Sequence, residues 1–151
     1  MIYFFDTSAL VKRYHQEKGT VYVDEIFEGI VEGKAEAFIS SLTLLEVTSA
    51  FKRKQKGNMI SESDFYDLIK TCFDEIIEHF TIVPANEDII NDSIENVLKY
   101  SLKTLDSIQF QTVKEVKEML DDDITVVTSD KELMTAFEEG EYEGVNPEEK
   151  V

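Results

Sequence analysis

The chain has 151 residues and a mass of 17.3 kDa, a length that fits one domain with a sizeable core. Hydrophobic residues make up 42% and charged residues 31%, which excludes a disordered chain. No apolar run approaches the roughly eighteen residues of a membrane span. The short apolar start ends at Asp6, so we expect no secretory signal. The single cysteine, Cys72, excludes a disulfide framework and a cysteine zinc site, and we expect a cytoplasmic protein.

The net charge of -17 is unevenly distributed along the chain. Residues 1–56 carry 8 basic and 8 acidic side chains, whereas residues 57–151 carry 7 basic and 24 acidic ones. Such a field repels nucleic acid unless metal ions or a local basic patch reverse it. For most of these carboxylates, solubility is a sufficient explanation.

The hydrophobic spacing predicts strands that alternate with helices along the whole chain. In chain order we expect a strand at 2–5, helices at 9–15 and 21–31, a strand at 37–39, helices at 43–55 and 61–78, a strand at 80–83, helices at 86–100 and 104–120, a strand at 124–128, a helix at 131–138 and a short edge strand at 142–145. This alternation predicts one α/β domain over residues 1–151, with a parallel sheet covered on both faces.

The helix at 104–120 has an apolar stripe that is expected to face the core. Its members are Leu105, Ile108, Val113, Val116 and Leu120. A charged loop, 121–123, separates this helix from the next strand.

Four acidic residues are expected at one rim of this sheet. Asp6 follows the first strand and Asp130 the fourth, Glu46 lies in the first turn of the helix that leaves the second strand, and Asp106 opens the helix at 104–120. In parallel α/β sheets, ligands bind outside the carboxyl ends of the strands. Carboxylates gathered there repel one another unless a cation lies between them, and hard divalent cations prefer oxygen ligands. The pattern therefore favours a shared metal site.

Three of the four acidic residues also have a purely structural interpretation, which the residues alone leave open. Asp6 and Asp130 stand where a helix N-cap is expected, and for either residue alone capping is the better explanation. Glu46 lies on a partly apolar helix face and needs a partner there. Arg53, two turns further on, could supply an ion pair.

Four blocks of the chain, in order, resemble the motifs of PIN-domain proteins. They are Ile-Tyr-Phe-Phe-Asp-Thr-Ser at 2–8, Ser-Ser-Leu-Thr-Leu-Leu-Glu-Val at 40–47, Thr-Leu-Asp-Ser-Ile at 104–108 and Val-Val-Thr-Ser-Asp-Lys-Glu-Leu at 126–133. Gly-Val-Asn-Pro at 144–147 is similar to the usual closing strand, so the resemblance covers nearly the whole chain. The third block departs from the pattern: it continues Gln-Phe-Gln-Thr, where small residues and a His are common.

The resemblance implies a three-layer α/β/α sandwich with a mostly parallel sheet of four to five strands. It also implies ribonuclease activity that depends on one or two Mg²⁺ ions, with Mn²⁺ as a substitute. By position, Asp6, Glu46, Asp106 and Asp130 would be the catalytic and metal-binding residues, and Thr7 and Thr128 would support the metal shell. For a small single-domain member such as this chain, the resemblance further implies a VapC-like toxin of a toxin–antitoxin pair. It therefore also implies a cognate antitoxin and a homodimer.

A dense basic run ends the helix that carries Glu46. It consists of Lys52, Arg53, Lys54 and Lys56, and Lys12 and Arg13 could extend it. One interpretation is that it complements the dipole of its own helix. The other is that it binds the RNA backbone beside the acidic rim, and the two are compatible.

Three other functions compete with a nuclease as explanations of this sequence. A noncatalytic PIN-fold interaction module, whose acidic surface binds a basic protein, stays open because of the net charge. A phosphoacceptor receiver needs an acidic pair after the first strand and an Asp at the end of the third. This chain lacks both, and Val83-Pro84 stands at the second of these places. A haloacid-dehalogenase site needs the motif Asp-x-Asp. Here the sequence is Asp6-Thr7-Ser8, so a serine stands in place of the second Asp.

Overall fold

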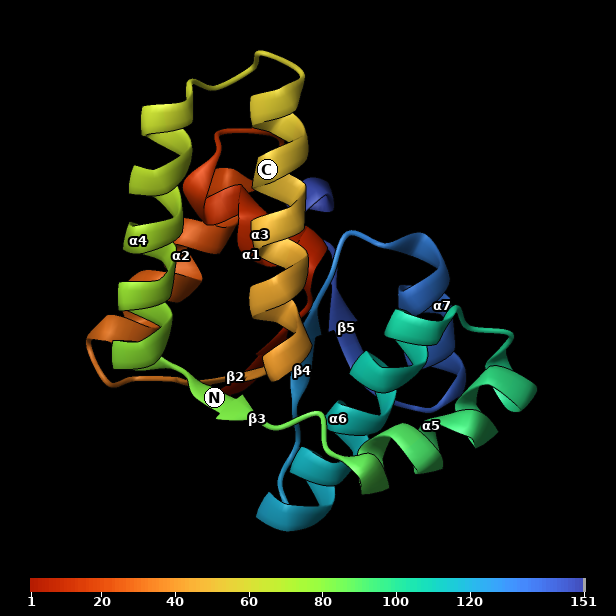
Figure 1. Cartoon of the computed structure of the whole chain (residues 1–151). Helices are drawn as coiled ribbons and strands as arrows, with labels where there is room; N and C mark the ends of the chain where they lie inside the picture. The colour runs from red at the N-terminus through yellow and green to blue at the C-terminus, as the bar shows by residue number, and fades with distance from the viewer. Residues whose placement is uncertain (151) are drawn as a thin grey trace.

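Seven α-helices, five strands and a short 3-10 helix make up the computed structural model, which describes residues 1–150 (Figure 1). The elements are β1 (Ile2–Phe5), α1 (Thr7–Tyr14), α2 (Thr20–Val31), β2 (Glu36–Ser40), α3 (Ser41–Lys56), α4 (Glu62–His79), β3 (Thr81–Val83), α5 (Glu87–Tyr100), α6 (Thr104–Leu120), β4 (Thr125–Val127), α7 (Lys131–Glu139), β5 (Glu143–Val145) and η1 (Pro147–Glu149). Every predicted helix and strand is confirmed, with ends that agree within two residues. No helix within residues 1–150 combines the length and apolarity needed to cross a membrane.

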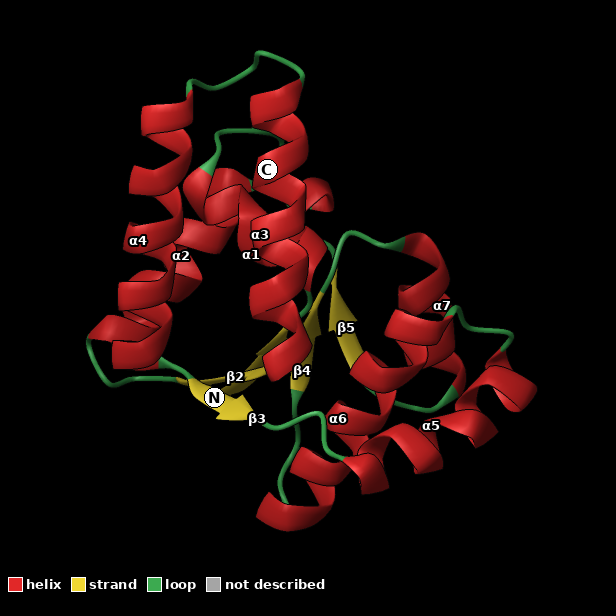
Figure 2. Cartoon of the chain, viewed as in Figure 1, coloured by secondary structure: helices red, strands yellow, loops and turns green. Residues whose placement is uncertain are grey.

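The five strands form one parallel sheet in the order β3-β2-β1-β4-β5 (Figure 2). This confirms the predicted α/β fold. The strand order reverses at β1, because β2 lies on one side of it and β4 on the other. In an open parallel sheet, such a reversal opens a crevice beyond the carboxyl ends of the two neighbouring strands whose connections leave in opposite directions, here β1 and β4. Asp6 and Thr128 directly follow those two ends.

Side chains on the central strand alternate between the two faces of the sheet, and each face is covered by helices. Phe5 packs in one cluster with residues of α1–α4, and Phe4 packs in another with residues of α6 and α7. Figure 1 shows α1–α4 on one side of the sheet and α5–α7 on the other. The molecule is therefore a three-layer α/β/α sandwich, as predicted.

The first turn of α6 departs from the predicted core stripe. Ile108, Val113 and Val116 are buried, whereas the prediction for Leu105 is wrong, because this side chain is 44% exposed. Leu105 lines a surface cleft instead of the core. The exposure follows from its position in the opening turn of the helix, next to Asp106.

Candidate metal centre

Asp6 is buried at the carboxyl end of β1, where it begins α1. Its Oδ1 accepts a hydrogen bond of 3.1 Å from the backbone N–H of Ala9, which is the geometry of an N-cap. Its Oδ2 accepts a bond of 2.8 Å from the hydroxyl of Thr128, which follows β4, and Ser8 Oγ lies 2.8 Å from Oδ1 and 3.0 Å from Oδ2. Asp6 therefore caps its helix and also fastens β1 to β4.

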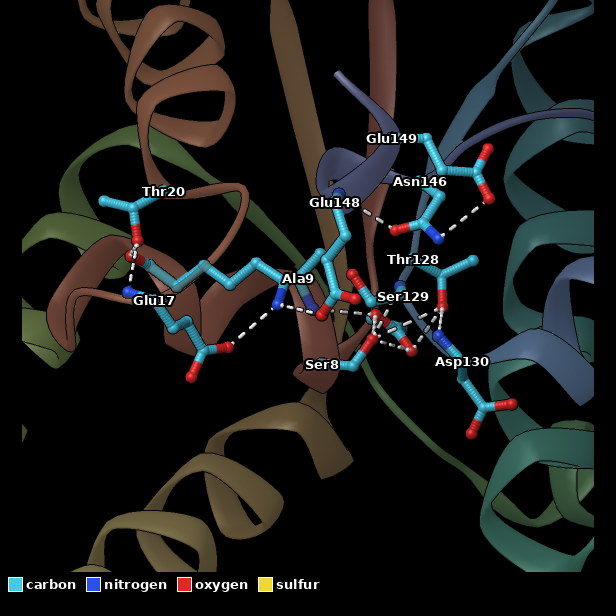
Figure 3. Close-up of polar contacts among 12 residues, drawn as sticks. Ser8, Ala9, Glu17, Thr20, Thr128, Ser129, Asp130, Asn146, Glu148 and Glu149 are labelled. Carbon is cyan, nitrogen blue, oxygen red and sulfur yellow. Dashed lines mark hydrogen bonds and ion pairs between the residues drawn. The ribbon is translucent and has the colours of Figure 1, made fainter. Parts of the chain in front are cut away.

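Asp130 lies beside this network and is held in a similar way. Its Oδ1 accepts a bond of 2.9 Å from the backbone N–H of Leu133, so Asp130 caps α7. Its own N–H donates to Thr128 Oγ1 at 3.1 Å, and the N–H of Ser129 donates to Ser8 Oγ at 2.9 Å (Figure 3). Capping and membership of one polar cluster are thus compatible for both aspartates.

Glu46 does not form the ion pair with Arg53 that the sequence left open. Among residues 1–150, no salt bridge joins the two, and the Arg53 guanidinium donates to Ser49 Oγ at 2.9 Å. The half-buried Glu46 carboxylate instead accepts a bond of 3.0 Å from the side-chain amide of Gln109 on α6. Its charge is oriented but not neutralised.

The four carboxylates share one electrostatic environment. Burial raises the pKa of Asp6 to about 7, with a contribution from Asp130, although hydrogen bonds from Thr128, Ser8 and Ala9 act in the opposite direction. Burial also raises the pKa of Asp106 to about 6, and the negative charges of Asp130 and Glu46 add to the effect. Segments far apart in the sequence thus bring mutually repelling carboxylates to one rim.

The chemistry of this donor set fits a hard divalent cation, although its spacing is wider than one ligand shell. Within residues 1–150, no group of three or more His, Cys, Asp or Glu side chains is close enough to hold an ion. The oxygen donors are nevertheless of the kind that Mg²⁺ and Mn²⁺ prefer, and two of them have raised pKa values that a cation would lower.

Thr7 adds an unused hydroxyl to the rim. Its Oγ1 is buried and has no hydrogen-bond partner within the described part of the chain. Thr7 and Glu46 both line a cleft of about 400 Å³. The other lining residues are Leu42, Leu45, Ser49, Arg53 and Leu105. A buried hydroxyl without a partner is uncommon in a native fold and is compatible with a supporting role at this rim.

Two polar residues of this region were missed by sequence reasoning. Ser8 lies two positions after Asp6 and bonds both of its oxygens. Gln109 lies three positions after Asp106 and is 2% exposed. A signal for Gln109 was present in the sequence: it is a polar residue between the core positions Ile108 and Phe110. It also lies one helical turn after Asp106, a candidate ligand on the same helix.

Lys12 and Arg13, which were predicted to extend the basic run toward RNA, form ion pairs within the protein. The Lys12 side chain is buried, and its Nζ lies 2.8 Å from Glu17 and 2.7 Å from Glu148. Arg13 is held by carboxylates of α2 and α4 at 2.9 and 3.4 Å. Lys12 fastens η1 to α1 from a buried position, whereas the Arg13 side chain remains 30% exposed.

The basic run of α3 divides between two settings. Lys52, Arg53 and Lys56 line a second cleft of about 420 Å³ between α3 and α4, together with Phe65 and Tyr66. This cleft shares lining residues, Arg53 among them, with the cleft at Glu46, so the two are continuous. Lys54 lines neither cleft. Three of the four predicted cations are therefore placed along one path toward the acidic rim.

Comparisons with known proteins agree with this architecture. The family model of the PIN domain matches residues 3–137. No curated protein matches the sequence. Among solved structures, PAE2754 from Pyrobaculum aerophilum has a TM-score of 0.64 and 16% identity, and the match covers 90% of this chain and 79% of that one.

Two further structures are similar over nearly their whole length. A toxin–antitoxin complex from Klebsiella pneumoniae has a TM-score of 0.62 and 19% identity, covering 95% of this chain and 96% of that one. FitAcB from Neisseria gonorrhoeae has a TM-score of 0.64 and 17% identity, covering 97% and 98%. At these identities, the similarity shows a shared fold.

Proposed function

The chain belongs to the PIN domain family, and from that premise we propose that it is a metal-dependent endoribonuclease that hydrolyses RNA phosphodiester bonds. The observation that carries the proposal is the rim at which Asp6, Glu46, Asp106 and Asp130 share one electrostatic environment. Buried carboxylates with raised pKa values, close to further carboxylates, are typical of functional sites.

In the proposed site the four carboxylates would hold Mg²⁺ or Mn²⁺, as one or two ions. The bound metal would supply an activated water and neutralise charge on the phosphate. Ser8 and Thr128 hold the Asp6 carboxylate by hydrogen bonds, and the N–H of Leu133 holds that of Asp130. Because these supports belong to strand ends and helix N-termini, the oxygen ligands are oriented before any substrate arrives.

We further propose that the protein acts as a toxin in the cytoplasm, restrained by a cognate antitoxin, and that it forms a homodimer. Support comes from the likeness in fold to a toxin–antitoxin complex from Klebsiella pneumoniae. An apolar stripe on the exposed side of α5 offers a surface that such assemblies could cover. It consists of Ile90, Ile94, Val97 and Leu98.

The function is tested by incubating a pool of structured RNAs with the purified protein in Mg²⁺, Mn²⁺ or EDTA. We expect cleavage with either metal, none with EDTA, and none from an Asp106→Asn variant prepared in parallel. Equal cleavage by the wild type and the variant would indicate a contaminant. Absence of cleavage by the folded wild type on all RNAs and with both metals would favour the noncatalytic interaction module.

Replacing Lys52, Arg53 and Lys56 by Gln is expected to weaken RNA binding about tenfold at low salt. The reason is that each phosphate contact releases counterions, with a slope of roughly 0.7 per charge on single strands. Losing three contacts should reduce the logarithmic salt slope by about 2, measured by fluorescence anisotropy between low and moderate salt.

A matched control for the basic residues replaces three lysines that line neither cleft by Gln: Lys18, Lys34 and Lys70. The control changes net charge equally and should reduce affinity much less. If both triple variants bind RNA with the same affinity and slope, the basic run only complements the dipole of α3.

A further inference from the structure

Gln109 is buried between the two helix layers, beyond the carboxyl ends of the strands. Its Nε2 donates to Thr43 Oγ1 at 3.0 Å and to Glu46 Oε1 at 3.0 Å, so both amide hydrogens are directed at α3. No other hydrogen bond within residues 1–150 reaches the Glu46 carboxylate. A single amide therefore sets the orientation of this carboxylate from across the crevice.

The orientation of the Gln109 amide leaves one of its own atoms without a partner. Gln109 Oε1 is buried and accepts no hydrogen bond within the described residues, a state that costs about 1–3 kcal/mol for a typical polar group. Turning the amide over would direct Oε1 at the Glu46 carboxylate and replace attraction by repulsion. The bond to Glu46 therefore determines the orientation, and an apolar residue of the same size would fill the space without this cost.

Gln109 differs from a charged partner in what it does to Glu46. An Arg or Lys would neutralise the carboxylate, whereas the amide holds one oxygen, Oε1, and leaves the charge intact. The second oxygen, Oε2, accepts no hydrogen bond within residues 1–150 and remains available. Carboxylates that ligate metals are commonly held by a neighbouring hydrogen bond of this kind.

We infer that Gln109 is a positioning residue that holds Glu46 as an oriented, anionic ligand for the divalent cation of the acidic rim. The inference rests on the proposed function and adds a residue to it. Gln109 acts only through Glu46, and Thr43 keeps the amide in the plane that this requires. The site is thereby supported from both helix layers, by Ser8 and Thr128 at Asp6 and by Gln109 at Glu46.

The test is a calorimetric titration of the folded, metal-free protein with Mn²⁺ at moderate salt, which measures the Mn²⁺ affinity. We expect Gln109→Met, which keeps size and flexibility, to weaken Mn²⁺ binding about tenfold, the lower end of what lost supporting bonds cost at metal sites. The matched control is Gln111→Met on the same helix. Gln111 is also buried, but its amide oxygen accepts from Asn96 at 3.1 Å between α5 and α6, so Mn²⁺ affinity should be unchanged.

A double variant separates positioning of Glu46 from a general structural effect. In a Glu46→Gln background, Gln109→Met should not weaken Mn²⁺ binding further, because the ligand that it orients is already changed. Additive losses, or Mn²⁺ affinity equal to the wild type in Gln109→Met, would overturn the inference while leaving the metal centre standing. If the folded wild type binds no Mn²⁺ at millimolar concentration, the proposed metal centre itself is refuted, and with it the role of Gln109. Should Gln109→Met not fold, Gln109→Leu takes its place in the same comparison.

Discussion

Asp6→Asn is expected to abolish RNA cleavage and, at pH 8 without metal, to raise the free energy of unfolding. Loss of a metal ligand should slow cleavage roughly a thousandfold or more, because the bound ion is worth several kcal/mol in the transition state. The stability gain has the opposite sign because Asp6 is buried as an anion at pH 8. Asn has nearly the same shape, caps a helix as well as Asp, and carries no charge to bury.

The gain in stability depends on pH in a defined direction. The pKa of Asp6 rises from 3.8 to about 7 on folding, so the native state holds this proton more tightly than the unfolded chain. Its contribution to stability is complete below about pH 4 and is lost as the pH rises through about 7. The full loss is on the order of 4 kcal/mol, and rearranged hydrogen bonds in the variant reduce the net gain to about 2 kcal/mol.

Urea unfolding in EDTA at pH 5 and pH 8 measures this difference. The free energy of unfolding of the variant should exceed that of the wild type at pH 8. At pH 5 the difference should be much smaller. The reciprocal exchange, Asn86→Asp, is the control, because Asn86 caps α5 through a bond of 3.0 Å to the N–H of Ile89, away from the rim. It should leave cleavage unchanged. Wild-type cleavage by Asp6→Asn would show that Asp6 is a helix cap alone.

The architecture and the acidic rim could be predicted because both depend on local signals. Short apolar runs, each followed by a capping residue, mark where strands end and helices begin. Parallel strands place all of their carboxyl ends at one edge, so Asp6 and Asp130 were expected together although 124 positions separate them. The rim follows from topology, which needs no knowledge of any individual side-chain contact.

The partners of individual side chains could not be predicted, because they depend on contacts between distant segments. Lys12 follows a candidate ligand by six positions and resembles a substrate contact, but the carboxylate of Glu148, 136 residues away, holds it in the interior. The bond from Gln109 to Glu46 spans 63 residues and has no periodicity to indicate it. Leu105 was assigned to the core by helical spacing, and only the position of α6 at the rim shows that its first turn is open.

Mn²⁺ is expected to raise the melting temperature of the wild type by about 5–10 °C at pH 8 and by less than half of this at pH 5.5. A ligand present at a hundred times its dissociation constant stabilises the native state by about 2.7 kcal/mol, and 1 kcal/mol corresponds to roughly 2–4 °C in a chain of this size. The pH dependence arises because the cation binds ionised carboxylates. Burial raises the pKa of Asp6 to about 7 and of Asp106 to about 6, so at pH 5.5 the metal must displace protons from both.

The control for this shift must separate the rim from the general acidity of the chain. A variant in which Asp121, Asp122 and Asp123 become Asn removes three exposed carboxylates that precede β4, at the opposite edge of the sheet, and should keep the full shift. Asp6→Asn should lose it. A shift that is equal at the two pH values, or that survives in Asp6→Asn, would mean that Mn²⁺ only screens the net charge of -17. A cation held by buried carboxylates has to compete with their protons, and a cation that merely screens exposed charge does not.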